Sequence, residues 1–114
     1  MKIWELLEKT NKPYFKYGTA PASTPENFFT FNNIDTNCVF SSDNEDNILV
    51  EVYDVCYYTR DPEEIYLQIN NFCKIAKQND WIISEYPSDI NVYEPGLLGR
   101  MVRVARVFEN DISQ

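Results

Sequence analysis

The sequence contains no histidine, and it has only three glycines among 114 residues. Without an imidazole, Cys–His and Ser–His nucleophile pairs and histidine metal sites are excluded. The isolated Gly18, Gly96 and Gly99 cannot form a glycine-rich loop that cradles a phosphate. The adjacent carboxylates Glu63 and Glu64 are explained by the first turn of a helix, where negative charge is favourable. We therefore expect a protein that is not an enzyme and that needs no cofactor and no metal ion.

The sequence also lacks an apolar run of membrane-spanning length, and the segment Met1–Glu5 has no apolar core of the kind that signal peptides carry. Its three cysteines are an odd number without a CxxC pair. Cys56 and Cys73 lie in apolar contexts, so we expect them to be buried free thiols, whereas Cys38 lies in a polar stretch. These features predict a protein of the cytosol that does not associate with membranes.

Positive charge is missing from a long part of the chain, since no Lys or Arg occurs between Lys16 and Arg60. The net charge is −8. The carboxylates in this interval are Glu26, Asp35, Asp43, Glu45, Asp46, Glu51 and Asp54. Binding to nucleic acid needs positive charge against the phosphates, so we expect none. Two interpretations remain open: a solvated acidic surface that aids solubility, or a surface that steers copies of the chain together, acidic face to basic strand.

The strongest local signal that is present marks the start of a helix. Asp61 can accept hydrogen bonds as the N-cap, Pro62 suits the first helical position, and Glu64 completes a capping box. Apolar residues then recur at helical spacing from Ile65 to Ala76. This pattern predicts an amphipathic helix that ends near residue 78 and lies on a sheet.

The remaining patterns alternate between short strands and polar connections. The expected elements are a helix over 2–9, a short extended piece over 14–17, strands over 27–32 and 48–58, the helix over 62–78, and strands over 81–85 and 97–109. We expect a polar connection over 33–47 and a turn at Pro87–Asp89. The order predicts an α+β fold, a mostly antiparallel β-sheet with two helices packed on one face. It forms a single domain over 1–114, with a frayed tail over 110–114.

The densest polar segment, Asp43–Asn47, directly precedes the longest strand pattern. Its alternating oxygens resemble those that begin a calcium loop, and Asp54 falls at the twelfth position. However, Ile48 replaces the glycine that the sharp turn of such a loop needs, and Asp54 lies deep in the expected strand. We interpret the segment as the solvent-facing tip between two paired strands, not as a metal site.

The basic residues of the last expected strand are Arg100, Arg103 and Arg106. Because side chains alternate along a strand, Arg103 should point to the face opposite Arg100 and Arg106. One face must be partly buried, so at least one of these arginines should have a carboxylate partner. Two interpretations are open: cross-strand ion pairs inside the monomer, or contacts between subunits.

The layout of nearly the whole chain, over about residues 2–109, resembles that of a known family. The stretches that carry the resemblance are Pro13–Gly18, Pro25–Phe31, Asp43–Asn44, Val50–Val55, Asp61–Glu63, Asp80–Trp81 and Tyr93–Leu97. The chain is similar to the small tail-terminator or tail-completion proteins of long-tailed bacteriophages and prophages of low-GC Gram-positive bacteria. Members generally return from the helix through Gly-Trp, whereas this chain has Asn79–Asp80 before Trp81.

The resemblance implies a structural function and a tail-terminator-like sandwich fold. Such proteins form a ring, commonly of six copies, that caps the tail tube, stops its polymerisation and offers a docking face to the head connector. The partners implied are further copies of the chain, the tail tube protein and the head connector protein. The location implied is the host-cell cytoplasm during assembly and then the head–tail junction of the virion.

Within this hypothesis, Asp43, Glu45 and Asp46 face a neighbouring subunit or the adjoining ring, and Arg100, Arg103 and Arg106 are their basic counterparts. One alternative is a head-completion or stopper protein, or another minor virion protein. An alternative of a different class is a small acidic inhibitor that mimics nucleic acid and binds a basic protein surface. That function would need carboxylates spread over a continuous face at phosphate-like spacing.

Overall fold

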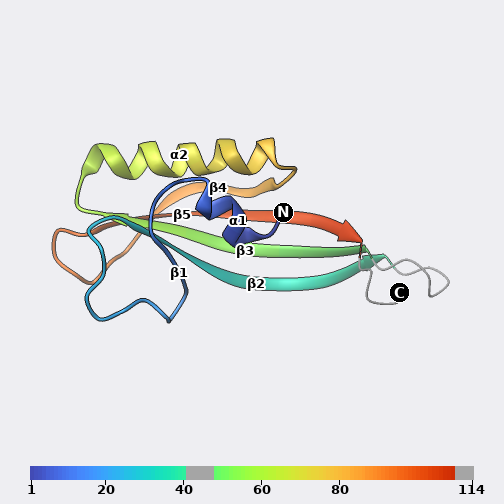
Figure 1. Ribbon diagram of the computed structural model, residues 1–114, viewed down its shortest axis with the longest axis horizontal. Helices are drawn as coiled ribbons and strands as arrows, with labels where there is room; N and C mark the ends of the chain where they lie inside the picture. Colours follow the sequence, from blue (N-terminus) through green and yellow to red (C-terminus); the bar gives the residue numbers. More distant parts are fainter. Residues whose placement is uncertain (41–47, 110–114) are drawn as a thin grey trace.

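The computed structural model describes residues 1–40 and 48–109 of the chain (Figure 1). Its elements, in order, are α1 (Ile3–Glu8), β1 (Tyr14–Lys16), β2 (Phe28–Phe40), β3 (Ile48–Thr59), α2 (Pro62–Gln78), β4 (Ile82–Ile90) and β5 (Leu98–Glu109). The expected tip with Asp43, Glu45 and Asp46, the expected tail over 110–114 and the side chain of Cys38 all lie outside the described residues.

The five strands form one sheet in the order β1-β2-β3-β5-β4. β1 is parallel to β2, and every other neighbouring pair is antiparallel. β3 lies at the centre, paired with β2 on one side and with β5 on the other. The last described strand, β5, is thus inserted between β3 and β4. The predicted α+β fold, a mostly antiparallel sheet with two helices, is confirmed.

The core lies between the sheet and its two helices. α2 buries Ile65, Ile69, Phe72 and Ala76, which follow the helical repeat on one side. They pack over Val55 and Tyr57 of β3 and over Val102 and Val104 of β5, all four completely buried. α1 adds Ile3, Leu6 and Leu7 to the same core. Both helices therefore cover the same face of the sheet, as Figure 1 shows.

The opposite face carries no helix in the described part of the chain. Side chains alternate along β3, so Asp54 and Cys56 point to this face while Val55 and Tyr57 point to the helices. Phe28 is nevertheless buried there, with its ring 5.1 Å from that of Tyr58. The end of β2, the start of β3 and the end of β5 extend past both helices (Figure 1), and this part of the sheet is called its distal part below.

Two predicted connections are wrong. The polar stretch from Asn33 continues β2 as far as Phe40, because its partners on β3 are strong β-formers, and an irregularity between Asn33 and Asp35 accommodates the extra residue. β4 likewise continues to Ile90 through the expected turn at Pro87. A proline is tolerated there because β4 is an edge strand with two register shifts.

Different local interactions determine where α2 begins and where it ends. At its start, the Asp61 side chain accepts hydrogen bonds from the backbone N–H groups of Glu63 and Glu64, as the sequence predicts. At its end, Asp80 adopts a left-handed conformation with φ 65°, and the N–H of Trp81 donates back to the carbonyl of Ala76 over 3.0 Å. This helix termination favours glycine at the Asp80 position.

Replacing Asp80 by glycine should therefore raise the free energy of unfolding by about 0.5–1 kcal/mol, since glycine adopts a left-handed backbone without steric cost. Asp80→Ala is the matched control and should lower the free energy of unfolding instead. Urea unfolding followed by circular dichroism measures both. A destabilised Asp80→Gly variant would contradict the role given to this backbone conformation.

Candidate functional site: the arginines of strand β5

Arg100, Arg103 and Arg106 all lie on β5, which has a strand on either side along most of its length. Each guanidinium forms an ion pair with a carboxylate of an adjacent strand. The expectation that at least one arginine has such a partner is confirmed for all three. Arg103 also points to the face opposite the other two, as its three-residue spacing predicts.

Arg103 is the centre of an ion cluster on the helix-free face of the sheet. Its Nε and Nη2 donate to the two carboxylate oxygens of Asp54, over 2.7 and 3.1 Å. Its Nη1 donates to Glu85 of β4. The Asp54 side chain is only 15% exposed, and the hydrogen bonds to Asp54 raise the pKa of the Arg103 guanidinium above its ordinary value. The planar, two-point geometry fixes β3, β5 and β4 to one another.

Arg106 lies on the helix-covered face, near the amino terminus. Its Nε donates to Glu51 over 2.6 Å, and its Nη1 donates to the backbone carbonyl of Met1 over 3.0 Å. The guanidinium carbon lies 4.5 Å from the Phe108 ring centroid and 5.5 Å from that of Trp81. The Trp81 indole N–H also donates to the carbonyl of Met1. Arg106 and Trp81 together hold the amino-terminal segment against the sheet.

Arg100 lies at the other end of β5, beside α2. Its Nη1 donates to Asp89 over 2.7 Å, and its guanidinium carbon is 4.8 Å from the ring centroid of Tyr66. A cavity of about 300 Å³ opens next to this pair, between the first turns of α2 and the β4–β5 connection. Its walls are mostly apolar, with Ile65 and Leu98 among them, and its carboxylate, Asp89, is already bound to Arg100.

The geometry matches the first of the two interpretations of the arginines, cross-strand pairing inside the monomer. The three arginine side chains are 17–31% exposed, and each is paired with a carboxylate, so they add little free positive charge to the surface. The carboxylates proposed from the sequence as their counterparts, Asp43, Glu45 and Asp46, lie outside the described residues. The pairing of these carboxylates with the arginines therefore stays a prediction.

The carboxylates that the structure pairs with these arginines were not predicted as partners from the sequence, although a signal for two of them is present. Glu51 and Asp54 are three residues apart on β3, as Arg103 and Arg106 are on β5. Because the spacing is equal, an antiparallel pairing that puts one carboxylate opposite one arginine also puts the other carboxylate opposite the other arginine. The register does place Glu51 opposite Arg106 and Asp54 opposite Arg103. Of the other two carboxylates, Glu85 lies at the end of the part of β4 that is predicted as a strand, and Asp89 lies in the part that was expected to be a turn.

Burial favours the neutral forms of two cysteines and of several tyrosines in the described region. Burial raises the pKa of the Cys56 and Cys73 thiols. Both cysteines are free, as expected, but they are only partly buried, so the expectation that they are buried is wrong. Burial also raises the pKa of Tyr58 to about 12. Such thiols are poor nucleophiles at neutral pH because the thiolate is the reactive form.

The described residues contain no group of three or more histidine, cysteine or carboxylate side chains placed to hold a metal ion. Neither of the helices described here has the length and apolar character that crossing a membrane requires. The arrangement can fix strands together and can present surfaces to other molecules. No protein-family profile matches the chain, and no curated protein shows significant similarity to it.

Proposed function

We propose that the protein is a structural component of virion assembly, which resembles a phage tail terminator. In this function it caps the tail tube as a ring of copies and joins the tube to the head connector, at the head–tail junction. The proposal rests on the layout in which the chain resembles that family. It assigns the function to surfaces of the protein rather than to a reaction centre.

The observation that carries the proposal is the conformation of Asp80. The family resemblance implies a glycine between the helix and the tryptophan that follows it, and Asp80 has the left-handed backbone that glycine favours, at φ 65°. Trp81 then directs its indole into the core and onto the carbonyl of Met1. The element order of the fold is also the order that the resemblance implies. Both agreements support the family assignment, and neither depends on the charges.

The ion pairs favour this function over that of an acidic nucleic-acid mimic. A mimic needs unpaired carboxylates spread over a face, but Glu51, Asp54, Glu85, Asp89 and Glu94 are each bound to an arginine. In the proposed ring, the arginines of β5 therefore stabilise the subunit, and contacts between subunits use other groups.

The test is deletion of the gene from a phage or prophage that carries it, with complementation by the wild-type gene as the control. We expect tails that are overlong, or tails that fail to join heads, when particles are measured by negative-stain electron microscopy. Tails of normal length that join heads would refute the function. Under complementation, joint reversal of Asp43, Glu45 and Asp46 to lysine should impair assembly more than the control Glu26→Lys.

A further inference from the structure

Within residues 1–40 and 48–109, no strand pairs with most of the outer edge of β2. β2 runs from Phe28 to Phe40, but β1 pairs only with its first part, at Phe29–Phe31. From Asn32 onwards no other described strand lies along this edge. Figure 1 shows β2 as the outermost strand of the distal part of the sheet, with β3 on its inner side. An edge of this length is a template for pairing with another chain.

The direction of the backbone groups along this edge follows from the register. The N–H of Phe29 and the carbonyl of Phe31 bond to the β1 segment, so these residues point outwards. β3 alternates without interruption, and the extra residue Ile34 shifts the alternation of β2 by one. Thr36, opposite Glu51, therefore directs its N–H and C=O outwards, whereas Asn37, opposite Val50, bonds inwards to β3. Cys38 has the same outward backbone direction as Thr36.

The edge has few of the features that usually protect exposed strands from pairing. Such strands commonly carry lysine, proline or strong bulges. Here neither lysine, arginine nor proline occurs from Glu26 to Thr59, and the stretch from Asp35 to Cys38 is regular. Both edge strands have two register shifts, those of β2 at Asn33/Asp35 and at Cys38/Phe40, but only β4 also carries a proline, Pro87. The two edges of the sheet thus differ by this proline, and the regular stretch of β2 between its two shifts is the better suited to accept a strand.

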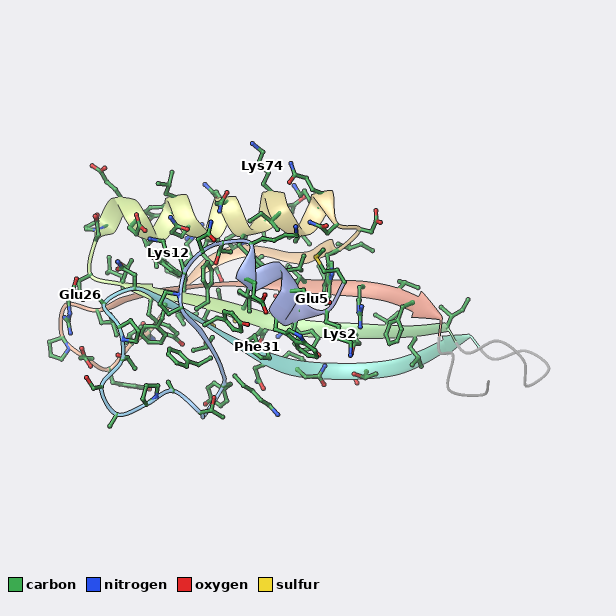
Figure 2. All side chains as sticks on the ribbon, viewed as in Figure 1. Lys2, Glu5, Lys12, Glu26, Phe31 and Lys74 are labelled. Atoms are coloured by element: carbon green, nitrogen blue, oxygen red, sulfur yellow. The ribbon has the colours of Figure 1, made fainter. Side chains whose placement is uncertain are left out.

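Charge indicates the kind of strand that would pair there. The segment around this edge is acidic in sequence and contains no cation, and Arg103 and Arg106 of the same sheet are already bound to Asp54 and Glu51. Positive charge must therefore come from elsewhere. A second copy brings a net charge of −8, and its opposite edge, β4, carries Glu85 and Asp89. Figure 2 shows Lys74 on the side of α2 turned away from the sheet, so it offers no cation to the edge of its own β2.

We propose that the outer edge of β2 binds an extended, basic segment of another protein, which adds a strand to the sheet. Backbone hydrogen bonds to Thr36 and Cys38 hold the added strand, and its lysines or arginines complement the net charge of −8 of this chain. This inference stands on the sheet edge alone and does not depend on the virion function.

The test uses the full-length ¹⁵N-labelled protein and a basic peptide as long as the Asn32–Phe40 edge, in which lysine alternates with valine and threonine. We expect the peptide to shift the amide signals of Thr36 and Cys38 and to protect these amides from hydrogen exchange. Thr36→Pro removes an outward N–H and should weaken peptide binding about tenfold or more. Thr36→Val is the matched control and should bind within about twofold of wild type, since it keeps the N–H and a β-branched side chain.

Three results would overturn the proposal. The first is the absence of amide shifts with the basic peptide, or equal shifts with an analogue that has glutamate for lysine. The second is unchanged binding by Thr36→Pro. The third is self-association of the wild-type protein at this edge, seen by sedimentation velocity without peptide and lost in Thr36→Pro, which would assign the edge to a second copy. If Thr36→Pro does not fold, Thr36→Lys takes its place. It keeps the N–H but should repel the basic peptide, so unchanged binding by this variant would overturn the proposal.

Discussion

Replacing Phe29 by alanine should lower the free energy of unfolding by about 3–5 kcal/mol, the range for removing a fully buried aromatic side chain. Phe29 is completely buried, and its ring centroid lies 4.5 Å from that of Tyr57 and 5.9 Å from that of Phe72. These contacts connect β2, β3 and α2 at one point. The loss combines the transfer of apolar surface to water with a cavity that this well-packed site cannot close.

Chemical denaturation at neutral pH measures this effect, with Tyr17→Ala as the matched control. Tyr17 is an aromatic residue near the same end of the sheet but is 66% exposed. Its replacement should change the free energy of unfolding by less than about 0.5 kcal/mol. A loss below about 1 kcal/mol in Phe29→Ala would mean that the helix layer does not close over β2 as described.

Replacing Arg103 by methionine should cost about 2 kcal/mol, because it leaves the carboxylate of Asp54 without its cation inside the sheet. The effect is smaller than that of a fully buried pair, since the Arg103 side chain is 31% exposed and that of Asp54 is 15% exposed. Removing both charges in Arg103→Met/Asp54→Leu should recover part of the loss, because apolar replacements of an ion pair are often neutral.

The matched control is Arg60→Met, which breaks the ion pair with Glu94. Both of these side chains are more than half exposed, at 54% and 59%. The control should therefore cost less than about 1 kcal/mol. Equal losses in the two arginine variants would show that the Arg103 cluster is no more than a surface pair. A double variant less stable than Arg103→Met would assign the loss to side-chain packing rather than to the unpaired carboxylate.

Those parts of the fold that depend on local signals are predictable from the sequence. Asp61 and Pro62 identify the start of α2 because a cap acts within one helical turn, and the β-formers from Ile48 to Tyr58 predict β3. The second half of β2 is not predictable in this way. Asn33 and Asn37 are poor strand formers, and they are in a strand only because β3 lies alongside them. The turn predicted at Pro87 is wrong for a similar reason, since a strand tolerates a proline there only because β4 lies at the edge of the sheet.

The ion pairs, too, are predictable from the sequence only in part. The alternation of Arg100, Arg103 and Arg106 between faces follows from strand geometry and is correctly predicted. Their partners depend on which strand lies beside β5, and this is a property of the topology. β3 is paired with β5 although a helix and β4 separate them along the chain. Sequence spacing alone shows that Glu51 and Asp54 could match Arg106 and Arg103, but it does not show that the strands meet.

The position of β5 also has a consequence for biosynthesis. A ribosome makes β3, α2 and β4 before β5, yet β5 must enter between β3 and β4 along their whole shared length. Until then α2 can cover only an incomplete surface, because Val102 and Val104 of the core are still missing. The fold therefore cannot be completed before β5 has left the exit tunnel. In that interval the inner edges of β3 and β4 are open to pairing with the wrong strand.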